Sequence, residues 1–145
     1  MTALDRLKDA VGASGFSEDE AEIAPHLEEW RSKYKGHTPL LLKPATTAEV
    51  SAVLRICQDT DTKLVTQGGN TGLVGGQIPI HGEVLLSTKR LNRIRHLDQS
   101  GMTLTVEAGV THIAPEGTAH FIRRKETGGR LAQSEAARLL PNFAL

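Results

Sequence analysis

The sequence predicts an α+β fold, with a small mixed β-sheet over residues 39–110 and helices on one side of it. The first observation behind this prediction is a strand, an amphipathic helix and a second strand over residues 39–66, an order that favours a parallel strand pair. The second is a set of later short runs with apolar residues, of which residues 102–107 alternate Leu104 and Val106 with threonines, as in a half-buried strand. The third is a length of 145 residues with 39% hydrophobic and 23% charged residues, which is typical of one soluble globular domain.

Two short helices are expected before the sheet. Thr2 and Asp5 have the spacing of a capping box, which predicts a first helix that Gly12 ends. Ser17 and Glu20 repeat this spacing and predict a second helix.

Pro25 limits the length of the second helix, and a connector follows it. Trp30 and Tyr34 lie four residues apart in this connector, which would place them on one face of a partly helical segment. We expect them to pack the N-terminal segment against the rest of the protein and not to contact a substrate.

The clearest local prediction is an amphipathic helix that ends near Asp59. Thr46 and Glu49 have capping-box spacing at its start. Apolar residues then occupy the i, i+3, i+4 and i+7 positions of one helical face: Val50, Val53, Leu54 and Cys57. Strands are expected on either side of this helix and beyond it, over residues 39–43, 62–66, 83–88, 93–98 and 102–107.

The charges balance overall but not locally. Seventeen basic and seventeen acidic residues give a net charge of zero, which excludes a strong overall field for nucleic acid or an anionic membrane. Residues 1–29 hold eight acidic and two basic residues, a net charge of −6, whereas residues 30–110 hold six acidic and ten basic residues, a net charge of +4. A basic body of this kind favours a small anion as its ligand. A local cluster of cations is expected on an exposed strand or turn face: Lys89, Arg90, Arg93 and Arg95.

Several other kinds of site find no support in the sequence. Cys57 is the only cysteine, so an intrachain disulfide and a cysteine-rich zinc site are excluded. The six histidines lack metal-ligand spacing, so we expect them on the surface, with no metal ion bound. No run approaches the ~20 apolar residues of a membrane helix. Asp5 and Asp9 argue against a targeting peptide, so a cytoplasmic location is expected.

The strongest functional signal is a glycine-rich loop directly after the strand predicted over residues 62–66. Five of the fourteen glycines lie within residues 68–76. Such a backbone tolerates positive φ and leaves N–H groups uncovered, which suits a phosphate or pyrophosphate. Asn70 and Thr71 add short polar side chains that can donate to the anion's oxygens. The spacings of the Rossmann and P-loop motifs are absent, and a flexible turn between two strands is the alternative interpretation.

Several short motifs follow one another along residues 30–110. They are Trp30-Arg31-x-x-Tyr34-x-Gly36, Lys43-Pro44-x-Thr46-x-x-Glu49-Val50, Gln67-Gly68-Gly69-Asn70-Thr71-Gly72-Leu73-Val74-Gly75-Gly76, Leu85-Leu86-Ser87 with Leu91-Asn92-x-Ile94, and Val106-Glu107-Ala108-Gly109-Val110. In this order they resemble the FAD-binding domain of the vanillyl-alcohol-oxidase or PCMH type. The resemblance covers about residues 25–110, and it is greatest to the branch of D-2-hydroxyglutarate dehydrogenases, D-lactate dehydrogenases and glycolate oxidase subunits.

The resemblance implies a fold, a cofactor and an activity. The fold would be the first half of a PCMH-type FAD-binding domain, and the activity the oxidation of a D-2-hydroxy acid to a 2-oxo acid, with a separate electron acceptor. The family's substrate-binding and metal-binding residues lie in a later domain, so the catalytic residues stay unknown.

The resemblance also implies where FAD is held. The loop backbone would bind the pyrophosphate, with flanking residues close to the nucleotide, and the implied cofactor-binding residues are Pro44, Gln67, Gly68, Gly69, Asn70, Thr71, Gly72, Leu73, Gly75, Gly76 and Ser87. Some relatives attach FAD covalently through a histidine directly after the paired glycines. Asn70 occupies that position here, so non-covalent FAD is expected.

Three segments are expected along the chain: a helical lead over residues 1–38, the partial FAD-binding domain over residues 39–110, and an unmatched tail over residues 111–145. Because the resemblance stops near Thr111, we hypothesise a shift of the reading frame there and a poorly ordered tail. Such a truncated relative is expected to retain flavin weakly or not at all, and to be inactive or weakly active. Two other classes stay open, namely a non-catalytic flavin- or nucleotide-binding module and a small α/β interaction protein.

Overall fold

The computed structural model describes residues 1–98, 100 and 103–110. The chain divides into two compact units, one of residues 1–91 and a second that starts at Asn92. The tail predicted over residues 111–145 lies outside the described residues.

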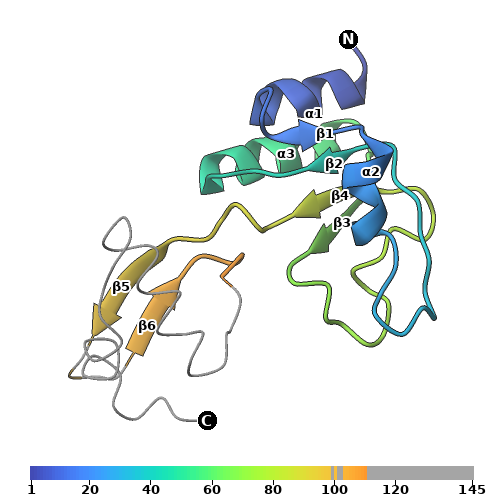
Figure 1. The fold of residues 1–145 in the computed structure, drawn as a ribbon. Coiled ribbons are helices and arrows are strands. Elements are labelled where there is room, and N and C mark those ends of the chain that lie inside the picture. The colour runs from blue at the N-terminus through green and yellow to red at the C-terminus, as the bar shows by residue number, and fades with distance from the viewer. Residues whose placement is uncertain (99, 101–102, 111–145) are drawn as a thin grey trace. The chain divides into compact units, whose positions relative to one another are not determined.

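The first unit contains a four-stranded mixed sheet (Figure 1). Its strands are β1 (Phe16–Ser17), β2 (Leu41–Leu42), β3 (Leu64–Gln67) and β4 (Val84–Ser87). They lie in the order β1-β2-β4-β3, with β2 and β3 parallel to β4 and β1 antiparallel to β2. The predicted α+β class with a small mixed sheet is confirmed.

The position of β4 differs from the simplest interpretation of the sequence. The strand, helix and strand over residues 39–66 are present and their strands run in the same direction, but β4 lies between β2 and β3. Every residue of β4 is buried, including Val84, Leu85 and Leu86 in succession. A strand that is apolar on both faces is stable only in the middle of a covered sheet, which explains why it takes the central position.

Two helices cover one face of this sheet (Figure 1): α1 (Ala3–Val11) and α3 (Thr47–Asp59). Their apolar sides share one buried cluster with alternate residues of the strands, which consists of Leu7, Val11, Leu40, Leu42, Val53, Cys57, Val84 and Leu86. Burying one such leucine side chain contributes roughly 1.5–3 kcal/mol to folding. No helix in the described part of the chain is both long and apolar enough to cross a membrane.

A shorter helical segment covers the opposite face of the sheet. It consists of α2 (Glu20–Ile23) and the 3-10 turn η1 (Ala24–His26). Ile23 packs there with Leu41 and Leu85. The helices therefore lie on both faces and not on one, because successive strand residues point to opposite sides and both sides are apolar.

The capping box predicted at the N-terminus is present. The N–H of Asp5 donates to Thr2 Oγ1 at 3.1 Å, and the N–H of Thr2 donates to Asp5 Oδ2 at 2.8 Å. The hydrogen bond from the Thr2 N–H lowers the pKa of the Asp5 carboxyl, and the interaction with the Thr2 hydroxyl lowers it further. This box therefore fixes the start of α1.

The other two predicted capping boxes form differently. Asp19 and not Ser17 caps α2, and Asp19 Oδ1 accepts an N–H of the first turn at 3.0 Å, because Ser17 is part of β1. Thr46 caps α3 as predicted, accepting the N–H of Glu49 at 3.1 Å. The Glu49 carboxylate accepts the N–H of Ala45, one residue before the cap, at 2.7 Å.

The second unit contains one antiparallel strand pair, β5 (Ile94–Asp98) with β6 (Thr103–Val106), among its described residues. Both strands lie where the sequence predicts them, within one residue at each end. The register shifts between Ile94 and His96, which introduces an irregularity in β5.

Among the basic residues predicted on one exposed face, Arg93 and Arg95 share one acidic partner, whereas Arg90 donates to main-chain carbonyls. Arg93 and Arg95 are 63% and 54% exposed, and both pair with Glu107, at 3.4 and 3.0 Å. The N–H of Arg93 also donates to this carboxylate and, with the two guanidinium groups, lowers the pKa of Glu107 although burial opposes the shift. In the first unit, Arg90 donates to the carbonyl of Lys43 at 2.8 Å.

Candidate cofactor-binding site

Three parallel strands end at one edge of the sheet, and the predicted cofactor residues lie along that edge. Gln67 is the last residue of β3 and pairs in register with Ser87, the last residue of β4. Pro44 follows the end of β2. In open α/β sheets the carboxyl ends of parallel strands line ligand crevices. The sheet thus brings together three residues that are far apart in the sequence.

The glycine loop leaves β3 at this edge and forms the exposed part of the predicted site. The predicted cofactor residues exposed in it are Gly68, Gly69, Thr71, Gly72, Leu73 and Gly76. By contrast, Pro44, Gln67 and Ser87 are less than 2% exposed and lie beneath the loop's surface. The exposed residues are therefore the ones that a ligand reaches first.

The main chain of the loop has uncovered hydrogen-bond donors. None of the N–H groups of residues 68–76 donates a hydrogen bond to any residue that the structure describes. Asn70 and Gly75 have φ values of 57° and 77°, in the left-handed region. Successive N–H groups in a turn of this kind form an anion-binding concavity.

The space beside the loop also fits a ligand. A Cβ built on Gly68 would meet only Thr88 Oγ1, at 3.8 Å, and one built on Gly76 would meet nothing within 4 Å, among the described residues. A diphosphate can thus approach the main chain at both glycines. The N–H groups and the open space satisfy two requirements of a phosphate site that the sequence predicts.

The side chain of Gln67 is engaged inside the protein and supports the loop from behind. Gln67 Nε2 donates to the carbonyl of His26 at 2.9 Å and to that of Gln77 at 3.1 Å. Gln67 Oε1 lies 2.5 Å from His26 Nδ1. His26 is 7% exposed, so the prediction of a surface histidine is wrong at this position. No spacing rule points to this contact, because His26 and Gln67 meet only when the sheet has formed.

The side chain of Asn70 likewise points into the protein. Asn70 Nδ2 donates to the carbonyl of Glu28 at 2.9 Å, and Asn70 Oδ1 accepts from Gln77 Nε2 at 3.3 Å. The same Gln77 nitrogen donates to the carbonyl of Gly72 at 2.8 Å. Asn70 therefore holds the loop in shape, whereas the sequence predicts a side chain that donates to the ligand.

Trp30 and Tyr34 do not lie on one helical face, because residues 30–36 form a turn and no helix. Trp30 is 68% exposed, and the guanidinium carbon of Arg31 lies 4.9 Å from its ring centre. Tyr34 does pack against the body: a Cβ at Gly75 would lie 2.7 Å from Tyr34 Cγ. The packing prediction is thus confirmed for Tyr34 and wrong for Trp30.

The turn that carries Tyr34 is built on a buried carboxylate. Glu29 is 1% exposed, and its oxygens accept the N–H groups of Arg31 and Lys33, each at 2.7 Å. Burial opposes ionisation, but these N–H groups and that of Tyr34 outweigh it and lower the pKa of the Glu29 carboxyl. Glu29 is not predicted from the sequence, since an acidic residue in an acidic segment carries no distinguishing signal.

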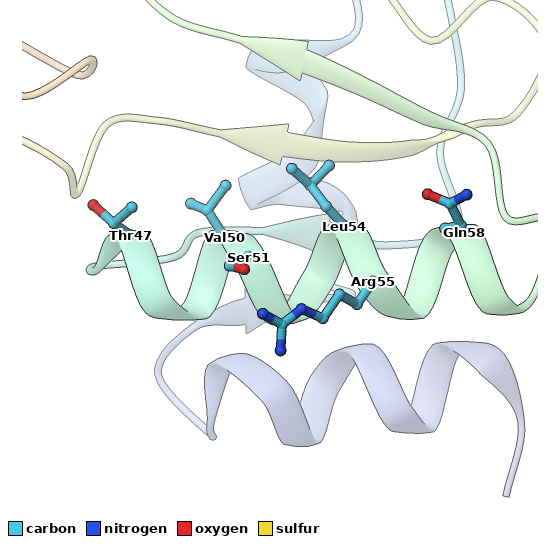
Figure 2. Close-up of a pocket in the computed structure, with 6 residues that line it drawn as sticks. All are labelled: Thr47, Val50, Ser51, Leu54, Arg55 and Gln58. Atoms are coloured by element: carbon cyan, nitrogen blue, oxygen red, sulfur yellow. The ribbon is translucent and has the colours of Figure 1, made fainter.

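A separate groove of about 320 Å³ lies on α3 (Figure 2). It is lined by Thr47, Val50, Ser51, Leu54, Arg55 and Gln58. None of the predicted cofactor residues lines it. Leu54 is 50% exposed there, so its predicted place on the buried face of the helix is wrong.

Comparison with known proteins identifies the family. The family model described as "FAD binding domain" matches residues 38–114, more than half of the chain. The chain therefore belongs to the FAD-binding domain family, and the predicted cofactor, FAD, is confirmed.

Relatives and a solved structure agree with this assignment. A probable mitochondrial D-2-hydroxyglutarate dehydrogenase of Oryza sativa subsp. indica is 43% identical over 102 residues, which are 70% of this chain and 18% of that protein. A putative mitochondrial D-lactate dehydrogenase of Schizosaccharomyces pombe is 40% identical over 94 residues, which are 65% of this chain and 18% of that protein. The structure of p-cresol methylhydroxylase has a TM-score of 0.65 at 22% identity, covering 75% of this chain and 22% of that chain. This last likeness confirms the PCMH-type fold.

The chain spans 18% of the length of each of these two curated relatives. The names of both relatives place them in mitochondria, which contradicts the prediction of a cytoplasmic location. That prediction rested on Asp5 and Asp9. Both lie in α1, a helix that packs on the sheet, so their charge reflects a folded surface and carries no information about targeting.

Proposed function

We propose that this chain supplies the diphosphate-binding part of an FAD domain, and that the activity it serves is the oxidation of a D-2-hydroxy acid to a 2-oxo acid. The observation that carries the proposal is the glycine loop, which lies at the carboxyl edge of three parallel strands. Its N–H groups donate no hydrogen bond to any residue that the structure describes. The names of two relatives supply the substrate class, because D-2-hydroxyglutarate and D-lactate share a hydroxyl group next to a carboxylate. When bound, FAD supplies the acceptor for the two electrons.

The residues divide into two roles. The exposed residues of the predicted site offer main-chain donors to the diphosphate: Gly68, Gly69, Thr71, Gly72, Leu73 and Gly76. The others set the position and shape of the loop from beneath: Pro44, Gln67, Asn70, Gly75 and Ser87. The partial FAD-binding domain over residues 39–110 therefore depends on the lead over residues 1–38, which provides His26 and Glu28 to this support.

The flavin is proposed to be held without a covalent bond. Asn70 occupies the position after the paired glycines, and its amide group is engaged with Glu28 and Gln77. An amide nitrogen is a poor nucleophile compared with an imidazole. Acid precipitation of the FAD-loaded protein is expected to release all of the flavin into the supernatant, and flavin in the pellet would contradict this.

The cofactor site is tested by Gly68→Val. The structure leaves room for this side chain, so the fold is expected to survive, but the valine would occupy the space through which a diphosphate approaches the main chain. Titration of the chain with FAD, followed by flavin fluorescence, is expected to show weak binding for the wild type and at least tenfold weaker binding for the variant.

Ala48→Val is the matched control, because Ala48 is exposed in the first turn of α3, outside the proposed site. It is expected to bind FAD like the wild type. Equal binding by the Gly68→Val variant would refute the loop assignment.

The substrate class has a separate test, in which D-2-hydroxyglutarate or D-lactate is added to the loaded protein. Bleaching of the oxidised flavin by the D but not the L enantiomer supports the proposed activity, and bleaching by the L enantiomer in place of the D, or by both alike, contradicts it.

A further inference from the structure

The back of the glycine loop is contacted by a second loop from the N-terminal lead. Residues 27–36, here called the support hairpin, form an antiparallel bridge between Glu28 and Lys35. The N–H of Gly36 closes it by donating to the carbonyl of Leu27 at 2.8 Å. None of these residues is among the predicted cofactor contacts.

The support hairpin contacts the glycine loop at two places and the segment directly after the loop at a third. The carbonyl of Glu28 accepts the side chain of Asn70 at 2.9 Å. The ring of Tyr34 covers Gly75, where it leaves no room for a side chain. A Cβ on Gly36 would collide with the carbonyl oxygen of Pro79, so the two main chains are in direct contact there. Two of these contacts fall on Asn70 and Gly75, the two loop residues that have positive φ.

The shape of the support hairpin depends on one carboxylate. Glu29 accepts the N–H groups of Arg31 and Lys33, and its own carbonyl accepts the N–H of Ser32 at 2.9 Å. These bonds hold Ser32 at a φ of 55°, which a non-glycine residue seldom adopts without compensation. Glu29 is almost fully buried, so it touches main-chain groups of the hairpin and offers no surface to a ligand.

We propose that Glu29 is a positioning residue for the cofactor: it folds the support hairpin, which in turn fixes Asn70 and Gly75 in the conformation that presents the loop's N–H groups to the FAD diphosphate. This inference rests on the proposed function, since it names the device that shapes the same site. Glu29 acts through Tyr34 and Glu28 and makes no contact with the cofactor.

Glu29→Gln tests the proposal, because the amide group keeps the size of the side chain but replaces one acceptor oxygen by a donor. That NH₂ group would face a main-chain N–H, so the hairpin is expected to open. Glu20→Gln is the matched control: it removes the same charge at an exposed position of α2, outside the support hairpin and the glycine loop. We expect the FAD dissociation constant to rise about tenfold in Glu29→Gln, equal to ~1.4 kcal/mol, and to stay unchanged in Glu20→Gln.

A second pair of variants keeps the test decisive if Glu29→Gln does not fold. Tyr34→Ala removes the ring that covers Gly75, whereas Tyr34→Phe keeps it. Tyr34→Ala is expected to weaken FAD binding, and Tyr34→Phe to bind like the wild type.

A spectroscopic measurement without FAD separates the two proposals. The amide NMR signals of the five loop glycines are expected to move or broaden in Glu29→Gln and Tyr34→Ala, while the signals of β4 stay in place. If these signals respond as expected but the wild type binds no FAD, the positioning role stands and the proposed function fails. If the wild type binds FAD and both variants match it in affinity and in loop signals, the positioning role is overturned.

Discussion

The sheet and the glycine loop of the first unit are stabilised in different ways. The sheet is filled on both faces by aliphatic side chains, with Leu40, Leu41 and Leu42 fully buried in succession. The loop is held from behind by side-chain to main-chain hydrogen bonds that start from Gln67 and Asn70. Aliphatic packing tolerates exchange of shape among similar residues, whereas each hydrogen bond requires one partner in one place. Substitutions can therefore change the stability of this unit and the geometry of its site separately.

The largest effect on stability is expected in the sheet. Leu86→Ala removes a side chain that is 2% exposed in the cluster between α1, α3 and the strands. The free energy of unfolding should fall by about 2–5 kcal/mol, because the site loses buried surface and keeps a cavity. Denaturant titration measures the change. Leu54→Ala, at a half-exposed position on α3, serves as the control and should cost less than about 1 kcal/mol. Equal losses in the two variants would contradict the assignment of the core.

A smaller loss of stability, with a larger effect on the site, is expected from Gln67→Leu. This variant keeps the volume but leaves the carbonyl of His26 without the amide that now donates to it. The cost should be about 1–3 kcal/mol for each group left unsatisfied, while FAD binding weakens as in the loop variants. Thermal unfolding and FAD titration on the same samples check both parts. A loss of stability without a loss of affinity would show that the loop does not depend on this support.

Acid should loosen the support of the loop before it affects the aliphatic core. The pKa of Glu29 is lowered in the folded protein, so its contribution to stability is present above the ordinary glutamate pKa, about 4.3, and is lost as the pH falls through the folded value. The stability difference between the wild type and Glu29→Gln should therefore be constant from pH 7 to about 5 and shrink below about 4. Chemical denaturation over this pH range measures it. A difference that stays constant down to about pH 3 would argue against an ionised Glu29 in the fold.

The smallest effect is expected at the surface, from the ion pair between Arg6 on α1 and Asp59 on α3. Its atoms lie 3.4 Å apart, and the two side chains are 39% and 62% exposed. Arg6→Gln should change the free energy of unfolding by about 0–1 kcal/mol, and added salt should remove the difference. A loss comparable with that of Leu86→Ala would mean that the helices are held on the sheet by charge.

The elements that the sequence predicts well are those with a complete local pattern. The capping box at Thr2 and the cap with apolar spacing after Thr46 define α1 and α3 almost to the residue. Both patterns are contained within a few turns of chain, so no distant contact is needed to interpret them. The glycine loop is also local, and its place after β3 follows from the order of residues.

The features that the sequence does not predict all depend on contacts between distant segments. Ser17 loses its place as a cap because it pairs with a strand, and Leu54 is half exposed because α3 turns another face to the sheet. His26 and Glu29 support the site through partners that the fold brings to them. Spacing along the chain carries no information about such partners, so the loop could be found from sequence but its support could not.

The central position of β4 has a consequence for synthesis of the chain. β4 is the last strand of the first unit to leave the ribosome, yet both β2 and β3 pair only with it on their inner sides. Until Ser87 has emerged, the two earlier strands have no parallel partner, and closure of residues 68–83 must precede the final pairing. Residues 68–83 therefore both carry the proposed cofactor site and form the connection that closes when the sheet is completed. A change in the length of this connection would alter the rate of folding as well as the binding of FAD.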